Sequence, residues 1–174
     1  MEKEALTKKF EGILGPEGLI SGREQLQTYE RDSLAGYAAV PKLAVLPETA
    51  EQVQKVVKVC HDEGVPFVAR GSGTCLSGGA LPLEEGILIV LSRMRRILEV
   101  DIPNRRVVVE PGVINLWVTQ EVAEAGYYYA PDPSSGLVSS IGGNVTENAG
   151  GVHCLKCSFT TNHVSGLEVM LPDG

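Results

Sequence analysis

A run of small residues, ARGSGTCLSGG at 69–79, carries the clearest chemistry in this chain, and it directly follows the apolar stretch VPFVA at 65–69. Glycine has no side chain, so the backbone N–H groups of such a loop can approach a bulky anion closely. Thr74 and Ser77 add hydroxyl donors that carry no charge. These residue types at this spacing indicate a cradle for a phosphate or pyrophosphate group, and a glycine turn that binds nothing is the alternative.

The loop matches neither of the two familiar glycine motifs that bind phosphates. A dinucleotide fingerprint, GxGxxG, needs a third glycine where this chain has Leu76, and a helix directly behind the loop, where Pro82 follows instead. A Walker A motif aligned on residues 73–78 needs Lys and then Ser or Thr, but Gly79 and Ala80 occupy those positions. Both motifs are excluded.

Two later segments, PDPSS at 131–135 and SSIGGNVTENAGG at 139–151, are also dense in small and polar residues. Taken alone, the pairs Gly142-Gly143 and Gly150-Gly151 fit tight turns between strands as well as ligand loops. Together with the first loop, they predict one extended polar ligand that several loops surround.

Regular elements must position these loops. LAVL at 43–46 is expected to be a strand, and Thr49 with Gln52 is expected to form a capping box at the start of a helix that ends at Gly64. The strand VPFVA follows, which predicts a parallel, right-handed strand-helix-strand unit. The glycine loop then lies at the carboxyl end of a strand, where open α/β sheets place their ligands.

Apolar patterning predicts more strands, at 87–91, 97–101, 106–110 and 166–171. The second and third of these are separated by Pro103-Asn104 and are expected to pair as a hairpin. A second helix is expected over about 116–125, ending at Gly126. Residues 127–129, three tyrosines, are expected to lead into a strand and to pack.

The composition excludes some classes of protein. The chain has 174 residues, is 43% hydrophobic and has a formal net charge of -7, which argues against nucleic acid as a partner because its binding needs clustered Lys and Arg. The basic cluster of Arg93, Arg95 and Arg96 is expected to be a solvated turn. No apolar run approaches the roughly 20 residues of a membrane span, and residues 1–10 are charged instead of signal-like. A cytoplasmic location is expected, with membrane contact only through partner subunits.

The order of the motifs resembles a known family. The motifs are RGSGT, VEPGV at 109–113, PDPSS, SSIGGNVTENAGGVHCLK and GLEVMLPDG at 166–174. They are similar to the FAD-binding domain of the vanillyl-alcohol oxidase (PCMH) type, and within it to the FAD-linked subunit of bacterial glycolate oxidase and the related D-lactate and 2-hydroxyglutarate dehydrogenases. The resemblance implies an α+β fold with a small parallel βαβ lobe and a second, mainly antiparallel sheet lobe with helices.

The resemblance also implies a domain organisation. Residues 1–40 would form an N-terminal helical and loop extension, and residues 41–174 the FAD-binding domain, with a first lobe over about 41–100 and a second over about 101–174. In this family the FAD domain continues beyond its LPDG turn. We therefore expect the domain to be incomplete at its C-terminus.

By resemblance, the first loop holds the FAD pyrophosphate, and the later segments hold the rest of the cofactor. Pro131 and Asp132 would line the flavin ring and ribityl chain, beside hydrogen bonds from two serines, and the glycine pair after them would allow a close approach. The predicted FAD-binding residues are Arg70, Gly71, Ser72, Gly73, Thr74, Cys75, Leu76, Ser77, Gly78, Pro131, Asp132, Ser139, Ser140, Gly142, Gly143, Asn148, Gly151 and Val169. Relatives that attach FAD covalently carry histidine in the first loop, where this chain has Thr74 and Cys75, so non-covalent FAD is expected.

The implied reaction is oxidation of a small 2-hydroxy acid, such as glycolate or D-lactate, by hydride transfer to flavin N5. Electrons would leave to another oxidase subunit or a carrier, and such subunits or self-association are the expected partners. In the family, the residues that bind the substrate carboxylate and accept its hydroxyl proton come after the point where this sequence stops. We therefore name no catalytic residue and expect this chain alone to be inactive. A truncated module that binds no flavin and serves only in interactions is the alternative.

A cluster of Cys and His residues supports a further hypothesis, a metal site or a redox dithiol. The cluster consists of His153, Cys154, Cys157 and His163. The remaining cysteines, Cys60 and Cys75, lie far away along the chain, so we predict reduced thiols and no metal. In relatives VHCLK is followed by Tyr-Gly, where this chain has Cys157-Ser158, and the conformation beside the flavin stays open at this point.

Overall fold

The computed structural model describes residues 2–174, and these divide into two compact units. Unit 1 comprises residues up to 93 together with 168–174, and unit 2 comprises residues 94–167. The domain boundaries expected from the sequence, near residues 40 and 100, stay predictions.

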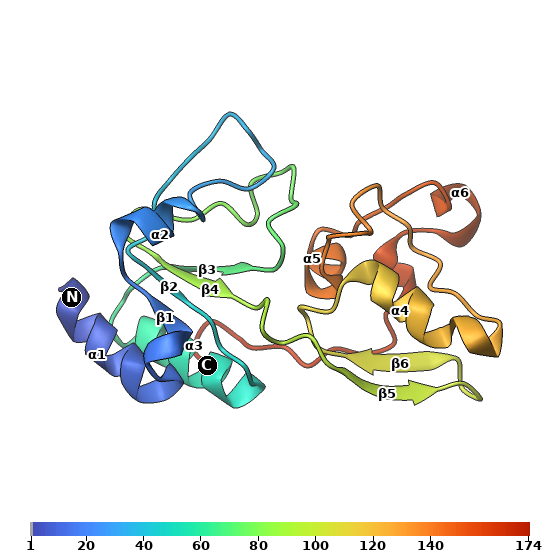
Figure 1. The fold of residues 1–174 in the computed structure, drawn as a ribbon, viewed down its shortest axis with the longest axis horizontal. Helices are drawn as coiled ribbons and strands as arrows, with labels where there is room; N and C mark the ends of the chain where they lie inside the picture. Colours follow the sequence, from blue (N-terminus) through green and yellow to red (C-terminus); the bar gives the residue numbers. More distant parts are fainter. Residues whose placement is uncertain (1) are drawn as a thin grey trace. The chain divides into compact units, whose positions relative to one another are not determined.

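Unit 1 is built on a four-stranded sheet in the order β1-β2-β4-β3 (Figure 1). Its strands are β1 (Leu19–Ile20), β2 (Leu43–Val45), β3 (Phe67–Arg70) and β4 (Ile87–Val90). Strands β2 and β3 both pair with β4 in parallel, and β1 pairs with β2 antiparallel. The predicted parallel strand-helix-strand unit is therefore present, with β4 inserted between its two strands.

Helices cover both faces of this sheet, and the side chains of β2 and β4 are therefore buried on both faces. Helices α1 (Lys3–Leu14) and α3 (Ala50–Asp62) pack through Leu6 and Val56, among others, on the face that carries Leu43 and Ile87. On the opposite face α2 (Arg23–Gln27) packs through Leu26, while the turn η1 (Pro16–Gly18) leads into β1. Helix α1 thus shares one core with the sheet.

Helix α3 begins at the predicted cap, with one difference in the bonding. The Gln52 N–H donates to Thr49 Oγ1 at 3.3 Å, as expected, but the Gln52 side chain accepts from the N–H of Glu48, at 2.7 Å, and not from Thr49. The long glutamine side chain thus reaches one residue further back. At the other end Gly64 has φ +62°, which explains why the helix stops there.

Unit 2 contains the predicted hairpin and short helices around it. The hairpin pairs β5 (Ile97–Asp101) with β6 (Arg106–Val109), and Asp101 accepts hydrogen bonds from Asn104 in the turn. The helices are α4 (Asn115–Val122), η2 (Ala123–Ala125), α5 (Ile141–Thr146), α6 (Cys154–Cys157) and η3 (Thr160–His163). The predicted second helix, its end at Gly126 and the α+β fold class are confirmed.

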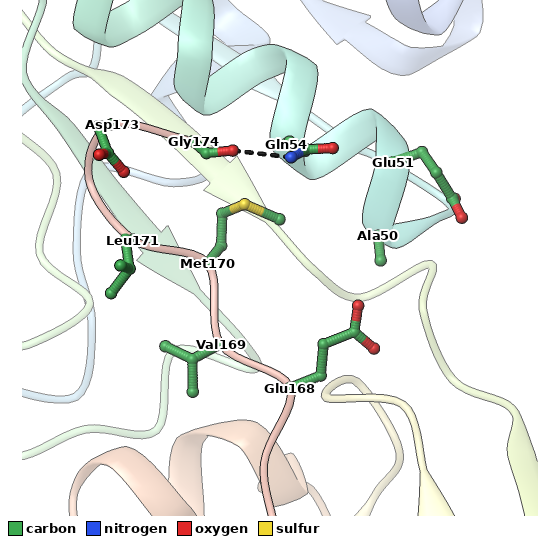
Figure 2. A pocket seen from close by; sticks show the side chains of 9 residues that line it. All are labelled: Ala50, Glu51, Gln54, Glu168, Val169, Met170, Leu171, Asp173 and Gly174. Carbon is green, nitrogen blue, oxygen red and sulfur yellow. Dashed lines mark hydrogen bonds between the residues drawn. The ribbon is translucent and has the colours of Figure 1, made fainter.

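Two expectations of local structure are wrong. Residues 166–171 form no strand, because no strand of the described chain pairs with them. Three residues further on, the Gly174 carbonyl accepts a hydrogen bond from Gln54 Nε2 at 2.8 Å (Figure 2). Residues 127–129 also form no strand, and Tyr127 and Tyr128 are exposed instead of packed.

A buried carboxylate joins the two ends of the hairpin. Glu110, directly after β6, is 6% exposed. One of its oxygens accepts from the Arg96 backbone N–H at 2.7 Å, and the other accepts from Arg96 Nε and Nη2 at 3.0 and 2.7 Å. These charge-assisted bonds hold the pKa of Glu110 below its ordinary value.

Glu110→Gln is expected to lower the free energy of unfolding by about 1–3 kcal/mol at neutral pH, because it weakens these buried charge-assisted bonds. Urea unfolding followed by circular dichroism measures the change. The matched control is Glu99→Gln, which breaks the exposed pair with Arg106 and is expected to cost at most about 0.5 kcal/mol.

The same variant gives a pH-dependent result. A carboxyl group whose pKa falls on folding stabilises the fold fully above its unfolded pKa, and this contribution is lost as the pH falls through the folded value. The difference in stability between wild type and Glu110→Gln should therefore be full above the ordinary carboxyl range and shrink as the pH falls below it. A difference that stays constant as the pH falls contradicts the assignment.

Candidate functional site

The glycine loop follows β3 directly, at the carboxyl end of an edge strand, as predicted. Arg70 is the last residue of β3, and residues 71–79 contain no helix or strand. Gly73 and Gly78 have φ of +72° and +81°, a conformation that side chains disfavour. The loop is therefore a fixed bend of the backbone at the position where such sheets bind ligands.

The loop leaves backbone donors available for a ligand. The N–H groups of Ser77 and Gly79 both donate to Cys75 Sγ, at 3.3 and 3.2 Å. Within residues 2–174, no protein acceptor meets the N–H groups of residues 72–76. Ser72, Leu76 and Ser77 are exposed. A row of free N–H donors with few cations nearby fits an anion such as a pyrophosphate.

The Arg70 guanidinium lies against the backbone of two other stretches of unit 1. Its Nη1 donates to the carbonyl of Arg31 at 2.7 Å, with further contacts to the carbonyls of Ala80 and Tyr29 at 3.3 and 3.5 Å. The guanidinium also lies 5.8 Å from the centre of the Tyr29 ring. Burial lowers the pKa of Arg70, and the charge of Asp32 acts in the opposite direction.

Residues 29–34, which we call the 29–34 segment, were missed by sequence reasoning. Ser33 Oγ donates to the Gly73 carbonyl at 3.4 Å, and a side chain at Gly78 would touch Leu34. In Figure 1 the blue loop after α2 and the green loop after β3 lie next to each other. The contacts use mainly backbone carbonyls, which every residue type carries, so no residue pattern could have indicated them.

In unit 2 the predicted residues 139–143 surround the start of α5. Ser140 caps this helix, because its Oγ accepts from the Gly143 N–H at 3.4 Å. A Cβ atom at Gly142 would lie 2.8 Å from Pro111 Cβ, so this glycine is required by packing inside the protein. The hydroxyl of Ser139 is buried and, among the described residues, has no partner.

The other predicted residues of unit 2 are partly brought together. Gly151 lies against the backbone of Asp132, where an added Cβ would be 1.9 Å from the Asp132 carbonyl oxygen. The carbonyl of Pro131 accepts from Asn115 Nδ2 at 3.1 Å. Asn148 bonds to a different residue: its Oδ1 accepts from the N–H and the hydroxyl of Thr161.

Unit 2 also holds buried polar atoms that suit a polar ligand. In the described chain, Ser139 Oγ and Asn144 Nδ2 are buried without a hydrogen-bond partner. Leaving a buried donor unpaired costs free energy, so such atoms mark positions where a ligand or water can bind. Unit 2 by itself thus offers unpaired donors for a ligand rich in hydrogen-bond acceptors.

Val169 lines a different pocket, in unit 1. The pocket lies beside the start of α3, with a volume of about 440 Å³, and Figure 2 shows the side chains around it. Its lining residues are Ala50, Glu51, Gln54, Glu168, Val169, Met170, Leu171, Asp173 and Gly174. None of the other predicted FAD-binding residues lines it. Its three carboxylates disfavour a phosphate there.

The Cys and His cluster makes bonds to the backbone instead of to one another. Cys154 Sγ accepts from the Gly151 N–H at 2.9 Å, and His163 Nε2 lies 2.6 Å from the Cys157 carbonyl oxygen. A helix of one turn begins at Cys154, and no strand directly precedes it. Among residues 2–174, no group of three or more His, Cys, Asp or Glu could hold a metal.

The cysteine of α3 is part of the core. Cys60 is fully buried in unit 1, and burial raises the pKa of its thiol to about 11.

In the part of the chain that the structure describes, no helix is both long and apolar enough to cross a membrane.

Comparison with known proteins identifies the family. A family described as FAD binding domain matches residues 41–174. The chain is 52% identical over 151 residues to "Glycolate oxidase subunit GlcD" of Escherichia coli (strain K12), covering 87% of this chain and 30% of that protein. It is 34% identical over 170 residues to "D-lactate dehydrogenase" of Anaerostipes hadrus, covering 97% of this chain and 35% of that protein. The chain thus spans about a third of the length of these curated relatives.

A solved structure supports the same assignment. The structure of p-cresol methylhydroxylase with substrate bound superimposes with a TM-score of 0.71 at 25% identity, covering 84% of this chain and 29% of that one. The resemblance of the ordered motifs is therefore confirmed, and FAD is the cofactor of the family. This chain belongs to the FAD-binding domains of the p-cresol methylhydroxylase and vanillyl-alcohol oxidase type.

Proposed function

We infer that this chain is the FAD-binding portion of an oxidoreductase that oxidises a small 2-hydroxy acid such as glycolate or D-lactate. The observation that carries this proposal is the 52% identity over 151 residues to a protein named as a glycolate oxidase subunit. The relative named D-lactate dehydrogenase supports the same substrate class. Both names belong to proteins of which this chain spans about a third.

The glycine loop binds the pyrophosphate of FAD in this proposal. The donors are the free N–H groups of residues 72–76 and the hydroxyls of Thr74 and Ser77. Uncharged donors suit a partly buried anion, because they bind it without bringing a counter-charge that also has to be desolvated. Cys75 supports the loop from within by accepting the N–H groups of Ser77 and Gly79.

Residues of unit 2 bind the remainder of the cofactor. The buried hydroxyl of Ser139 is available for a hydrogen bond, whereas the Ser140 hydroxyl already caps α5. Gly151 packs against the backbone of Asp132, the residue after Pro131, and this stretch can serve as a wall. FAD, when bound, supplies the acceptor for the hydride of the substrate. Binding is non-covalent, because none of the three histidines of the chain lies in the first loop.

We assign no catalytic residue to this chain. In the family, the groups that hold the substrate carboxylate and accept the hydroxyl proton belong to the remainder of the protein. The chain on its own is therefore expected to bind FAD without turning over substrate. Electrons leave to another subunit or a carrier, which agrees with the word "subunit" in the name of the Escherichia coli relative.

Titration of the purified chain with FAD tests the cofactor assignment. We expect saturable quenching of flavin fluorescence with one FAD per chain, a shifted absorption spectrum between 300 and 550 nm, and complete release of FAD into the supernatant after acid precipitation. The absence of saturable binding would support the alternative, a module that serves only in interactions. Flavin that stays with the precipitate contradicts non-covalent binding.

Ser72→Glu tests the role of the glycine loop. The new carboxylate is exposed and lies among the free N–H groups, so it should repel the pyrophosphate and weaken FAD binding about tenfold or more, with little change in thermal stability. Ser92→Glu is the matched control, because it adds the same charge at an exposed position outside the loop. Equal effects of the two variants on the FAD dissociation constant would remove the loop from the site.

A further inference from the structure

The guanidinium of Arg70 connects three separate stretches of unit 1. It belongs to the end of β3, and its Nη1 binds the carbonyls of Arg31 and Tyr29 in the 29–34 segment and of Ala80 at the far end of the glycine loop. The strongest of these bonds, to Arg31, is 2.7 Å long. A half-buried cation that binds backbone carbonyls on both sides of a loop restrains where that loop can lie.

Gly73 lies directly against this guanidinium. A Cβ atom at position 73 would be 2.2 Å from Arg70 Nη2 and 2.6 Å from Cζ. A side chain at the centre of the loop would therefore displace the guanidinium, and the φ of +72° at Gly73 disfavours one in any case. The backbone of the loop at Gly73 and the Arg70 side chain are thus packed directly against each other.

The 29–34 segment completes the arrangement from the other side. Ser33 Oγ donates to the Gly73 carbonyl, and the Asp32 carboxylate orders the turn by accepting from the Leu34 N–H at 2.8 Å. The other oxygen of Asp32 is buried without a partner among the described residues. This segment precedes residues 41–174, the part of the chain that matches the FAD binding domain family.

We propose that Arg70 is a positioning residue, which ties the 29–34 segment to both ends of the glycine loop and thereby holds the loop amides ready for the FAD pyrophosphate. The inference rests on the proposed function, because it assumes that the loop binds FAD. It assigns a part of the cofactor site to residues outside the matched domain. It also assigns Arg70 to the loop backbone instead of to the cofactor itself.

Arg70→Lys separates position from charge. Lysine keeps the positive charge but lacks the planar guanidinium, whose Nη1 makes all three carbonyl bonds while its Nη2 and Cζ lie against Gly73. Amide hydrogen exchange of the chain without FAD should then become at least about tenfold faster in both the 29–34 segment and residues 71–80. The FAD dissociation constant, measured by fluorescence quenching well below the unfolding temperature, should rise at least about tenfold.

Arg95→Lys is the matched control, since it makes the same substitution at an exposed arginine of unit 2. Its exchange pattern and FAD affinity should stay within about twofold of wild type. A merely structural role of Arg70 would lower the unfolding temperature but leave the FAD affinity of the folded protein unchanged. That result would overturn the proposal.

A direct contact between Arg70 and the cofactor gives another pattern. In that case Arg70→Lys leaves exchange in the FAD-free chain unchanged, and this outcome also overturns the proposal, whatever the affinity. If wild type binds no FAD, the proposed function fails by itself, whereas the exchange comparison still decides whether Arg70 holds the loop.

Asp32→Asn is a second variant that tests the same coupling, for use if Arg70→Lys does not unfold cooperatively. Asparagine keeps an oxygen for the Leu34 N–H but removes the negative charge that acts on Arg70. Exchange in residues 71–80 should rise at least about threefold, although the change is in the other segment. An unchanged rate there would show that the two segments are not coupled and would reject the proposal.

Discussion

The double-sided burial of β4 is the constraint on which unit 1 depends. All four of its residues, Ile87–Val90, are buried, and it lies between β2 and β3 in parallel. Such a strand is stable only when elements cover both of its faces, and α1 with α3 on one side and α2 on the other supply that cover. This layering places the carboxyl end of β3, and with it the glycine loop, at an edge of the sheet where its amides remain accessible.

Much of this layer could be read from the sequence because its signals are local. The apolar runs at 43–46 and 87–91, the cap at Thr49 and the stop at Gly64 each depend on residues within one or two turns of the chain. The same holds for the hairpin around Asn104. The ordered glycine motifs identified the family for a similar reason, because each motif is a short continuous segment.

The failures concern features that depend on partners far away in the sequence. Residues 166–171 have the apolar composition of a strand, yet a strand exists only where a neighbouring strand offers its backbone groups. Tyr127 and Tyr128 are aromatic but exposed. The role of Arg70 was invisible because its acceptors are backbone carbonyls of the 29–34 segment, and these carry no residue-type signal.

Glycine has more than one reason to be present in this fold. Gly142 is required by Pro111 and Gly151 by the backbone of Asp132, while Gly73 has φ +72° and lies against the guanidinium of Arg70. A pattern that indicates ligand binding is therefore also a pattern of close contact within the protein. Loss of one of these glycines would disturb the fold even before a cofactor is considered.

Because the 29–34 segment meets Arg70 mainly through main-chain oxygens, the side chain at Arg31 can differ among related proteins without loss of those hydrogen bonds, whereas the Tyr29 ring also lies beside the guanidinium. The number of residues between these carbonyls is not free, since one residue more or less would move an acceptor by up to about 3.5 Å along the chain. Natural variation in this stretch should therefore take the form of substitutions, with insertions and deletions displaced to either side of it.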